Sequence, residues 1–391
     1  MSAIVTSHKT GVVTEHGELC IFDPLENRGR AITYPKESFG NSGVVMMSMF
    51  TVEQASAYDV TGCVMCVTVD GMLWQCDQKQ TRGPDPLPPI HIPSSRFGNS
   101  VAVMVSIGER HMLLLTAAGT VWSQGTGEHE VLGHVNERDN SALKQVFFNT
   151  GDEQQDPDAP TLIAMVSVST VHSAGLTCDG YLWTWGCGDS GQLGFGEMED
   201  KLVPTPLSKE HRPTHGEDIR DPIVMMTTGR QNTLVVTKKG LLWGWGNDIP
   251  LCNTHGKQWT PLLLGTAETF DGARVLSAAC GDHGTVILTV NGDLWSLGDA
   301  NDRMCLKYKV EVQRVPIRIE HPCKFVSVSA FQDAHSAVTT EGEIYEWGEL
   351  PPPVTFEYLP MARWKDEKTL FVKVHRLSAI KTLYDARPGR F

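Results

Sequence analysis

The side chains that could do chemistry in this 391-residue chain are histidines, cysteines and acids, so their spacing decides whether they form a site. Residues 128–134 carry two histidines in a pattern that looks like a metalloprotease helix. His129 and His134 are five residues apart rather than four, so they do not share a helix face. Cys63 and Cys66 form a single CxxC on a predicted strand, where residues three apart point to opposite faces. Because neither pattern supplies a ligand set, we expect no metal and no cofactor.

Motifs of covalent or phosphate chemistry are missing from the sequence. It contains no GxxxxGK[ST] loop, and no Ser, Cys or Thr lies in a recognisable nucleophile context. We therefore predict no catalytic residue and a protein that is not an enzyme. His111 and His172 remain, each eight residues before a glycine of the repeat described below. They are either ligands or, as we favour, structural histidines hydrogen-bonded to backbone inside the fold.

An acidic stretch ends the longest insertion, which runs from about residue 128 to residue 160. Its carboxylates would meet a basic partner, and the alternative is a solvated loop. Long loops on a rigid scaffold often carry binding. The predicted partner-binding residues are the four acids of this stretch and two arginines of the C-terminal tail, namely Asp152, Glu153, Asp156, Asp158, Arg387 and Arg390.

The C-terminal region has the opposite charge. Residues 361–391 carry eight Lys or Arg and three acids, a surplus of five, so the remainder stands at −18 against −13 for the whole chain. Such a tail suits nucleic acid or an acidic protein surface, and the alternative is a basic strand lying on an acidic ring. An acidic body repels phosphate backbones, so the sequence disfavours broad nucleic-acid binding.

The cellular setting follows from absent signals. The N-terminal residues lack the apolar core of a secretory signal, and no run of 18 apolar residues is available to cross a membrane. The ten cysteines show no obvious pairing, as is typical of reduced thiols. We expect an intracellular protein, cytoplasmic or nuclear, with protein partners and no membrane contact.

Seven glycines recur with the same neighbours, and this repeat predicts the fold. They lie 48 to 61 residues apart, each with an aliphatic residue two positions later. Three positions later, six of the seven repeats have a large aromatic residue. The glycines are Gly17, Gly71, Gly119, Gly180, Gly240, Gly292 and Gly342, and the aromatic residues are Trp74, Trp122, Trp183, Trp243, Trp295 and Tyr345.

Each repeat has the pattern of two strands joined by a tight turn. The clearest, residues 172–186, places Asp-Gly between two alternating β-prone runs, which is a strong hairpin signal. Glycine supplies the positive φ of such a turn at no steric cost. The expected hairpins lie near residues 8–22, 61–76, 111–125, 172–186, 231–246, 283–298 and 335–348.

Further runs around the hairpins complete a four-stranded unit. Val- and Met-rich runs such as residues 101–108 are expected to be inner strands covered on both sides, and Pro204 and Pro261 to begin outer edge strands. Seven such units predict an all-β fold, a seven-bladed β-propeller that residues 1–391 form as a single domain. Each aromatic residue is expected to pack against the next blade, burying roughly 200 Å² per tryptophan.

A closed ring must join its two ends. Residues 371–377 repeat the pattern of the inner-strand run 325–331, so residues 369–391 are predicted to supply a closing inner strand for the first blade and a basic tail. Residues 3–6 compete for the same position, and the sequence leaves both open.

Residues 179–196 read DGYLWTWGCGDSGQLGFG, and Leu132-Gly133 is a remnant of the same G-Q-L-G element one repeat earlier. This string resembles the repeat of the regulator-of-chromosome-condensation family. The resemblance implies a seven-bladed propeller. One branch of that family exchanges nucleotide on the small GTPase Ran and docks on nucleosomes, and many other members are interaction platforms. It therefore implies a non-enzymatic protein-interaction module that binds through blade-connecting loops. The alternatives are a guanine-nucleotide exchange factor for a Ran-like GTPase and a chromatin adaptor that binds histones.

Overall fold

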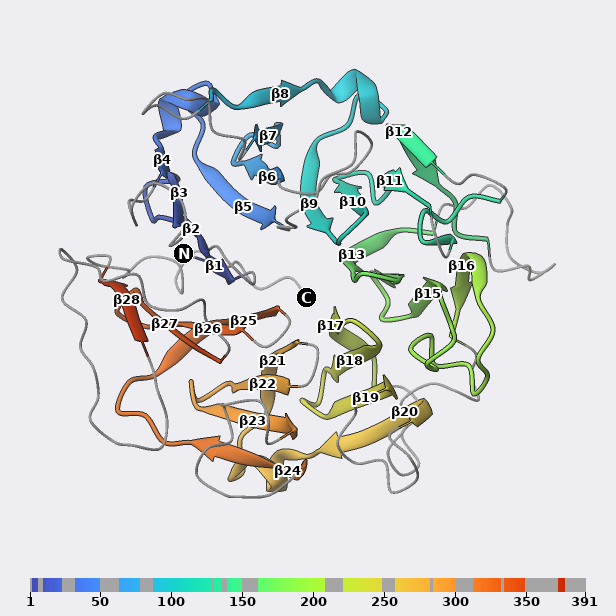
Figure 1. The fold of residues 1–391 in the computed structure, drawn as a ribbon, viewed down its shortest axis with the longest axis vertical. Helices are drawn as coiled ribbons and strands as arrows, with labels where there is room; N and C mark the ends of the chain where they lie inside the picture. Colours follow the sequence, from blue (N-terminus) through green and yellow to red (C-terminus); the bar gives the residue numbers. More distant parts are fainter. Residues whose placement is uncertain are drawn as a thin grey trace.

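Seven four-stranded antiparallel sheets stand around a common axis in the computed structural model of this chain (Figure 1). The all-β, seven-bladed propeller expected from the repeat is therefore confirmed. The structure describes residues 2–5, 10–22, 32–49, 63–77, 87–127, 130–135, 139–149, 161–207, 221–247, 257–281, 284–299, 312–331, 334–348 and 372–376.

The chain builds the blades in order, each from its innermost strand outward. Blades one to three are β1 (Ser2–Val5), β2 (Thr10–Val13), β3 (Leu19–Phe22) and β4 (Ile32–Tyr34); β5 (Val44–Met49), β6 (Cys63–Thr68), β7 (Leu73–Asp77) and β8 (Ile90–Ile92); and β9 (Ala102–Ile107), β10 (His111–Thr116), β11 (Val121–Thr126) and β12 (Asp139–Val146). Blades four and five are β13 (Ile163–Val168), β14 (His172–Thr177), β15 (Leu182–Gly186) and β16 (Lys201–Pro206); and β17 (Ile223–Thr228), β18 (Asn232–Thr237), β19 (Leu242–Asn247) and β20 (Lys257–Gly265). Blades six and seven are β21 (Val275–Cys280), β22 (Gly284–Thr289), β23 (Leu294–Asp299) and β24 (Val312–Ile319); and β25 (Phe325–Phe331), β26 (Ala334–Thr339), β27 (Glu343–Gly348) and β28 (Val372–Arg376).

The repeated glycines form the turns between the second and third strands of the blades. All seven have positive φ, from 73° to 85°. A threonine stands three residues before every one of them, and in six blades its hydroxyl accepts a hydrogen bond from the N–H four residues later, as Thr177 does from Tyr181 at 2.8 Å. The turn therefore needs both residues, and the seven threonines are a signal that the sequence-based reasoning missed.

The same turn also joins neighbouring blades. The carbonyl oxygen of Gly17 accepts a hydrogen bond from Val44 N, the first residue of the next inner strand, at 2.8 Å. A Cβ on Gly180 would lie 2.5 Å from Pro222 of the next blade. Glycine is thus required here for close approach as well as for φ. We call this side of the ring, which carries the seven turns, the glycine-turn face.

The aromatic residues pack against the preceding blade, so the expected direction was wrong. Trp243 and Trp245 of blade five lie in one cluster with Leu182 of blade four, and Trp185 of blade four lies with Val121 of blade three. The aliphatic residue two positions after each glycine faces the following blade instead. Alternation along a strand separates the two side-chain sets but does not tell which neighbouring blade each set meets.

Buried phenylalanines complete three of these interfaces. Short 3₁₀ turns follow the outer strands β4, β8 and β20, and each carries one buried phenylalanine, namely Phe39, Phe97 or Phe270. Phe39 meets Trp74 edge-on at 5.8 Å between ring centroids, and Phe270 meets Trp295 at 5.3 Å. Edge-to-face pairs of this kind add about 0.5–1.5 kcal/mol to the burial of the rings.

The ring is not closed by the C-terminal strand, which corrects the first of the two expectations. β28 pairs antiparallel with β27 and is the outer strand of blade seven, and β1 pairs with β2 as the inner strand of blade one. The ends meet where β1 lies against β25 and β26, and where Val12 packs with Val338 and Ile344. Each blade is thus completed within its own stretch of chain.

The expectation of a long insertion after residue 128 is also corrected. It contains the turn Glu130–His134 and the outer strand β12, so it is part of blade three. Its acidic end, residues 150–160, lies outside the described residues, as do residues 128–129 and 136–138. Thr161 Oγ1 donates to the Phe148 carbonyl oxygen at 3.3 Å and joins the two ends of that segment.

Candidate interaction surfaces

Two backbone carbonyls are each held by a pair of donors from the following blade. Trp185 Nε1 and Ser173 Oγ donate to the Val131 carbonyl oxygen at 2.8 and 2.9 Å. One blade later, Trp245 Nε1 and Thr233 Oγ1 donate to the Gln192 carbonyl oxygen at 2.9 and 2.8 Å. We call these arrangements the carbonyl clamps.

The clamps explain the G-Q-L-G element. Gly194 and Gly133 have φ values of 86° and 75°, and each lies against the indole nitrogen of its clamp tryptophan. The carbonyl of the leucine in each element also accepts a hydrogen bond. Thr184 Oγ1 donates to Leu193 O, and Ser123 Oγ donates to Leu132 O. Leu132-Gly133 is therefore the structural counterpart of the intact element, as the sequence suggested.

His111 and His172 lie behind the clamps and are fully buried. His111 Nε2 is 2.7 Å from Ser173 Oγ, and His172 Nε2 is 2.9 Å from Thr233 Oγ1. Each hydroxyl gives its one hydrogen to a clamp carbonyl, so it must accept from the histidine, which assigns the proton to Nε2. Through Nε2 the histidines bind side chains of the next blade rather than the backbone, and His172 Nδ1 lies 2.8 Å from Ser169 Oγ of its own blade.

Their surroundings keep both histidines neutral. Burial lowers the pKa of His172 to about 3, and burial together with the nearby His172 lowers the pKa of His111 to about 3. A buried neutral imidazole that supports a clamp is a structural element. Neither side chain reaches solvent where it could bind a partner.

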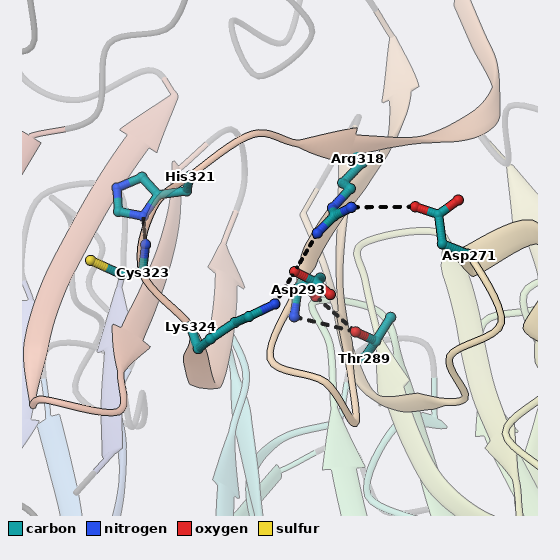
Figure 2. A network of polar contacts seen from close by, with 7 residues as sticks. All are labelled: Asp271, Thr289, Asp293, Arg318, His321, Cys323 and Lys324. Carbon is teal, nitrogen blue, oxygen red and sulfur yellow. Dashed lines mark hydrogen bonds and ion pairs between the residues drawn. The ribbon is translucent and has the colours of Figure 1, made fainter.

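A network of ion pairs on the glycine-turn face joins blades five, six and seven. Figure 2 shows Asp293 between Arg318 and Lys324, with Asp271 beyond the guanidinium. Lys324 Nζ and Arg318 Nη2 lie 2.6 and 2.8 Å from Asp293 Oδ1, and Arg318 Nη1 lies 3.4 Å from Asp271 Oδ2. Burial raises the pKa of Asp293, but hydrogen bonds from Lys324 and Arg318 bring it below its usual value. Because the cations are exposed, solvent screens these pairs and they contribute little to stability.

Figure 2 also contains His321 and Cys323. Both lie near Tyr345 of blade seven. His321 Nδ1 accepts from Cys323 N at 3.1 Å, and its ring meets Tyr345 at 4.6 Å. Burial is the main cause that lowers the pKa of His321.

Burial also raises the pKa of Cys280 to about 12 and that of Cys66 well above its usual value, so these thiols stay protonated. Among the described residues, no three His, Cys, Asp or Glu side chains are placed to hold a metal ion.

The partner-binding residues expected from the sequence lie outside the described part of the chain. They are Asp152, Glu153, Asp156, Asp158, Arg387 and Arg390. The residues that flank the acidic segment are described, however. Phe148 and Thr161 stand between the outer strand β12 and the inner strand β13, at the glycine-turn face. Of the part of the chain that is described, no helix has the length and apolar character needed to span a bilayer.

Comparison with known proteins finds one matching repeat model and several similar proteins. The model of the regulator of chromosome condensation (RCC1) repeat matches residues 179–236. The E3 ubiquitin-protein ligase HERC2 of Homo sapiens is 27% identical over 274 residues, which are 69% of this chain and 5% of that protein. The human RCC1-like G exchanging factor-like protein is 24% identical over 270 residues, 67% of this chain and 56% of that protein.

A solved structure supports the same fold. The structure of Prp20p from Saccharomyces cerevisiae superposes with a TM-score of 0.64 at 18% identity, covering 85% of this chain and 80% of that one. The chain spans a twentieth of HERC2 and little more than half of the exchanging factor-like protein. With its glycine turns, carbonyl clamps and matched repeat, the chain resembles the RCC1-like repeat proteins.

Proposed function

We propose that this propeller is a non-enzymatic protein-interaction module that binds a protein partner through the loops connecting its strands. The observation that carries this proposal is the use made of the buried polar groups. His111, His172 and the clamp hydroxyls are all engaged in joining blades. The groups best suited to chemistry therefore serve rigidity, and a rigid scaffold with exposed loops on two faces suits docking.

Affinity capture with the immobilised full chain tests this proposal. A partner should bind saturably, at a fixed stoichiometry, and should be released by excess soluble propeller. The matched control is the same chain carrying Trp245→Phe and Trp185→Phe, which loosens the blades without changing an exposed loop. The proposal is wrong if no partner saturates the folded chain, or if purified substrates are turned over by it.

A second candidate is guanine-nucleotide exchange on a Ran-like GTPase. One relative is an RCC1-like G exchanging factor-like protein, and Prp20p binds Gsp1p and histones. Exchange would need no covalent chemistry, because a protein that binds the nucleotide-free GTPase more tightly than the loaded form shifts it toward release. Release of labelled nucleotide, followed with catalytic amounts of this chain, decides the matter. A tenfold acceleration, about 1.4 kcal/mol off the barrier, would favour exchange, and an unchanged rate would exclude it.

The acidic segment is the proposed contact for a basic partner. The residues that flank it, Phe148 and Thr161, lie on the glycine-turn face between blades three and four. Reversing Asp152, Glu153, Asp156 and Asp158 to lysine should abolish binding of such a partner. Reversing an exposed acid on another loop, Glu199, is the control. Equal loss from both changes would mean that overall charge, rather than this segment, governs binding.

A chromatin adaptor is the third candidate, and the basic tail with Arg387 and Arg390 would carry it. The charge of the tail is opposite to that of the body, and histones are among the proteins that Prp20p binds. Removal of residues 386–391 should then abolish nucleosome binding and flatten its dependence on salt. Binding that survives the removal unchanged would reject the tail as the contact.

A further inference from the structure

Six of the seven inner strands carry a bulge at the same position. In each, the second residue has no partner on the neighbouring strand, and the register shifts around it. A bulge inserts one residue and re-aims its side chain. The bulged residues are all aliphatic, namely Val45, Val103, Ala164, Val224, Leu276 and Val326. Four of them are exposed, Val45 by 53%, Val103 by 43%, Val224 by 46% and Leu276 by 42%. The sequence-based expectation of inner strands covered on both sides is therefore wrong at this position.

These residues lie at one axial end of the ring. The inner strands are the innermost elements in Figure 1, and their first residues bond to the glycine turns, as Ala102 N does to Gly71 O and Val275 N to Gly240 O. The bulged residue comes directly after that first residue, so it lies on the glycine-turn face. The turn residues and the residues that lead into the strands beside it add four more exposed aliphatic side chains, Val69, Val101, Leu162 and Val290. We call the four exposed bulge residues together with these four the apolar ring.

A layer of methionines lies next to the apolar ring. The residue after the bulge is methionine in four consecutive blades, and each side chain is half-buried and packs against a core cluster, namely Met46, Met104, Met165 and Met225. Methionine is flexible and polarizable, and it is over-used at surfaces that accommodate several apolar shapes. Scattered aliphatic residues on a surface need no explanation, but a ring backed by methionines indicates a docking surface.

One part of the apolar ring lies beside exposed cations, although the whole chain is at −13 and acids such as Asp70 and Asp221 stand beside Val69 and the start of β17. Lys238 and Arg274 are exposed at the junction of blades five and six, and neither makes an ion pair with any described residue. Arg274 stands two residues before Leu276, and a Cβ on Gly240 would lie 2.5 Å from Arg274 Cβ. Two cations thus flank the part of the ring formed by Val224, Leu276 and Val290.

We propose that the apolar ring docks an extended segment of a partner protein that carries a bulky aliphatic or aromatic side chain flanked by carboxylates. The apolar side chain would lie against the ring and the methionines, and the carboxylates would pair with Lys238 and Arg274. This inference rests on the proposed function and names the working face and the partner's chemistry. The affinity is apolar in origin, and the charges fix the orientation and raise the association rate.

A displayed library of random dodecamer peptides, selected on the immobilised full chain, tests the inference. The enriched peptides should combine a Trp, Phe, Leu or Ile with neighbouring Asp or Glu. A dye-labelled synthetic copy of an enriched peptide is then titrated and followed by fluorescence anisotropy. Val224→Asp and Leu276→Asp should each weaken binding at least tenfold. Val315→Asp is the matched control, because Val315 is 63% exposed on the outer strand β24.

The charge arm uses Lys238→Glu and Arg274→Glu, which should remove most of the salt dependence of binding. Lys36→Glu, a change at an exposed lysine in the 3₁₀ turn after β4, is the control.

Val224→Ser repeats the apolar arm in case the aspartate variant does not fold. Enriched peptides without carboxylates, or equal losses from Val315→Asp and Val224→Asp, would overturn the inference. So would a dimer that Val224→Asp dissociates, since the ring would then serve a second copy. If captured partners still bind the Val224→Asp variant, the proposed function stands and this inference alone fails.

Discussion

Mild acid should destabilise this propeller through two buried histidines. His111 and His172 are neutral in the folded protein because burial lowers each pKa to about 3. In the unfolded chain the same groups titrate near 6.5. A base whose pKa is lower in the folded state binds more protons when unfolded, so it favours folding above pH 6.5. That stabilisation decreases as the pH falls below 6.5, and it continues to decrease until the folded pKa is reached.

The magnitude follows from these pKa values. Between pH 7.5 and 5.5 the folded histidines stay neutral, while each unfolded histidine becomes mostly protonated. Linkage then removes about 1.4 kcal/mol of unfolding free energy per histidine, or about 2.7 kcal/mol for the two together. A loss of that size is a large fraction of the ~5–15 kcal/mol that keeps a typical protein folded. Both clamps would therefore weaken within the mildly acidic range.

Urea titrations at pH 7.5 and 5.5, followed by circular dichroism, measure this loss. The informative comparison is with His172→Asn, because blade five has Asn232 at the equivalent position. The variant will be less stable at both pH values, but its loss between them should be smaller by about 1.4 kcal/mol. His321 and the carboxylates titrate in both proteins, so their contributions cancel in the comparison. Equal losses in wild type and variant would refute the reasoning.

Three further outcomes follow from the fold. Trp245→Phe should lower the unfolding free energy by about 1–3 kcal/mol in urea titrations, because it removes a buried donor to the Gln192 carbonyl, whereas Trp259→Phe at an exposed site should have little effect. Gly180→Ala should lower the melting temperature more than Gly272→Ala, because both glycines have φ above 80° but only Gly180 has a neighbour within 4 Å. Removing residues 1–7, which include β1, should cause aggregation in light scattering, whereas removing residues 369–391 should leave a folded ring. The reverse result would restore the C-terminal strand as the closing element.

The sequence was sufficient to predict the structure of one blade but not how neighbouring blades pack against each other. Glycine with an aliphatic and an aromatic residue at fixed offsets predicts a hairpin because the turn has a local cause. The threonine three residues before each glycine has a local cause too, and it could have been found by aligning the repeats. The direction in which the tryptophans pack could not be predicted from the repeats, because it depends on the side of the sheet on which the next blade lies. The prediction of how the ring closes was wrong for a similar reason, because residues 371–377 have a pattern that suits an inner or an outer strand.

The candidate surfaces were harder to predict because they depend on exceptions to a pattern. The inner strand Ile223–Thr228 of blade five begins with four consecutive apolar residues and therefore predicts a covered strand. The bulge at Val224 shifts the register by one residue and leaves that side chain exposed at the end of the ring. No composition rule separates a bulged valine from a buried one. The buried histidines are the opposite case, since their residue type suggests chemistry while their surroundings assign them to the clamps.

The apolar ring and the clamps together explain how a rigid ring can present an adaptable surface. The inner strands are fixed by hydrogen bonds across the blade interfaces: Ser48 Oγ accepts from Ile107 N, and Ser167 Oγ accepts from Thr228 N. The bulge residues stand at the other end of the same strands and take no part in those bonds. Their side chains can therefore change rotamer to fit a partner without loosening the ring. Substitutions at Val224 or Leu276 should for this reason alter binding with little effect on stability, whereas substitutions at Thr233 should alter both, because that hydroxyl joins His172 to a clamp.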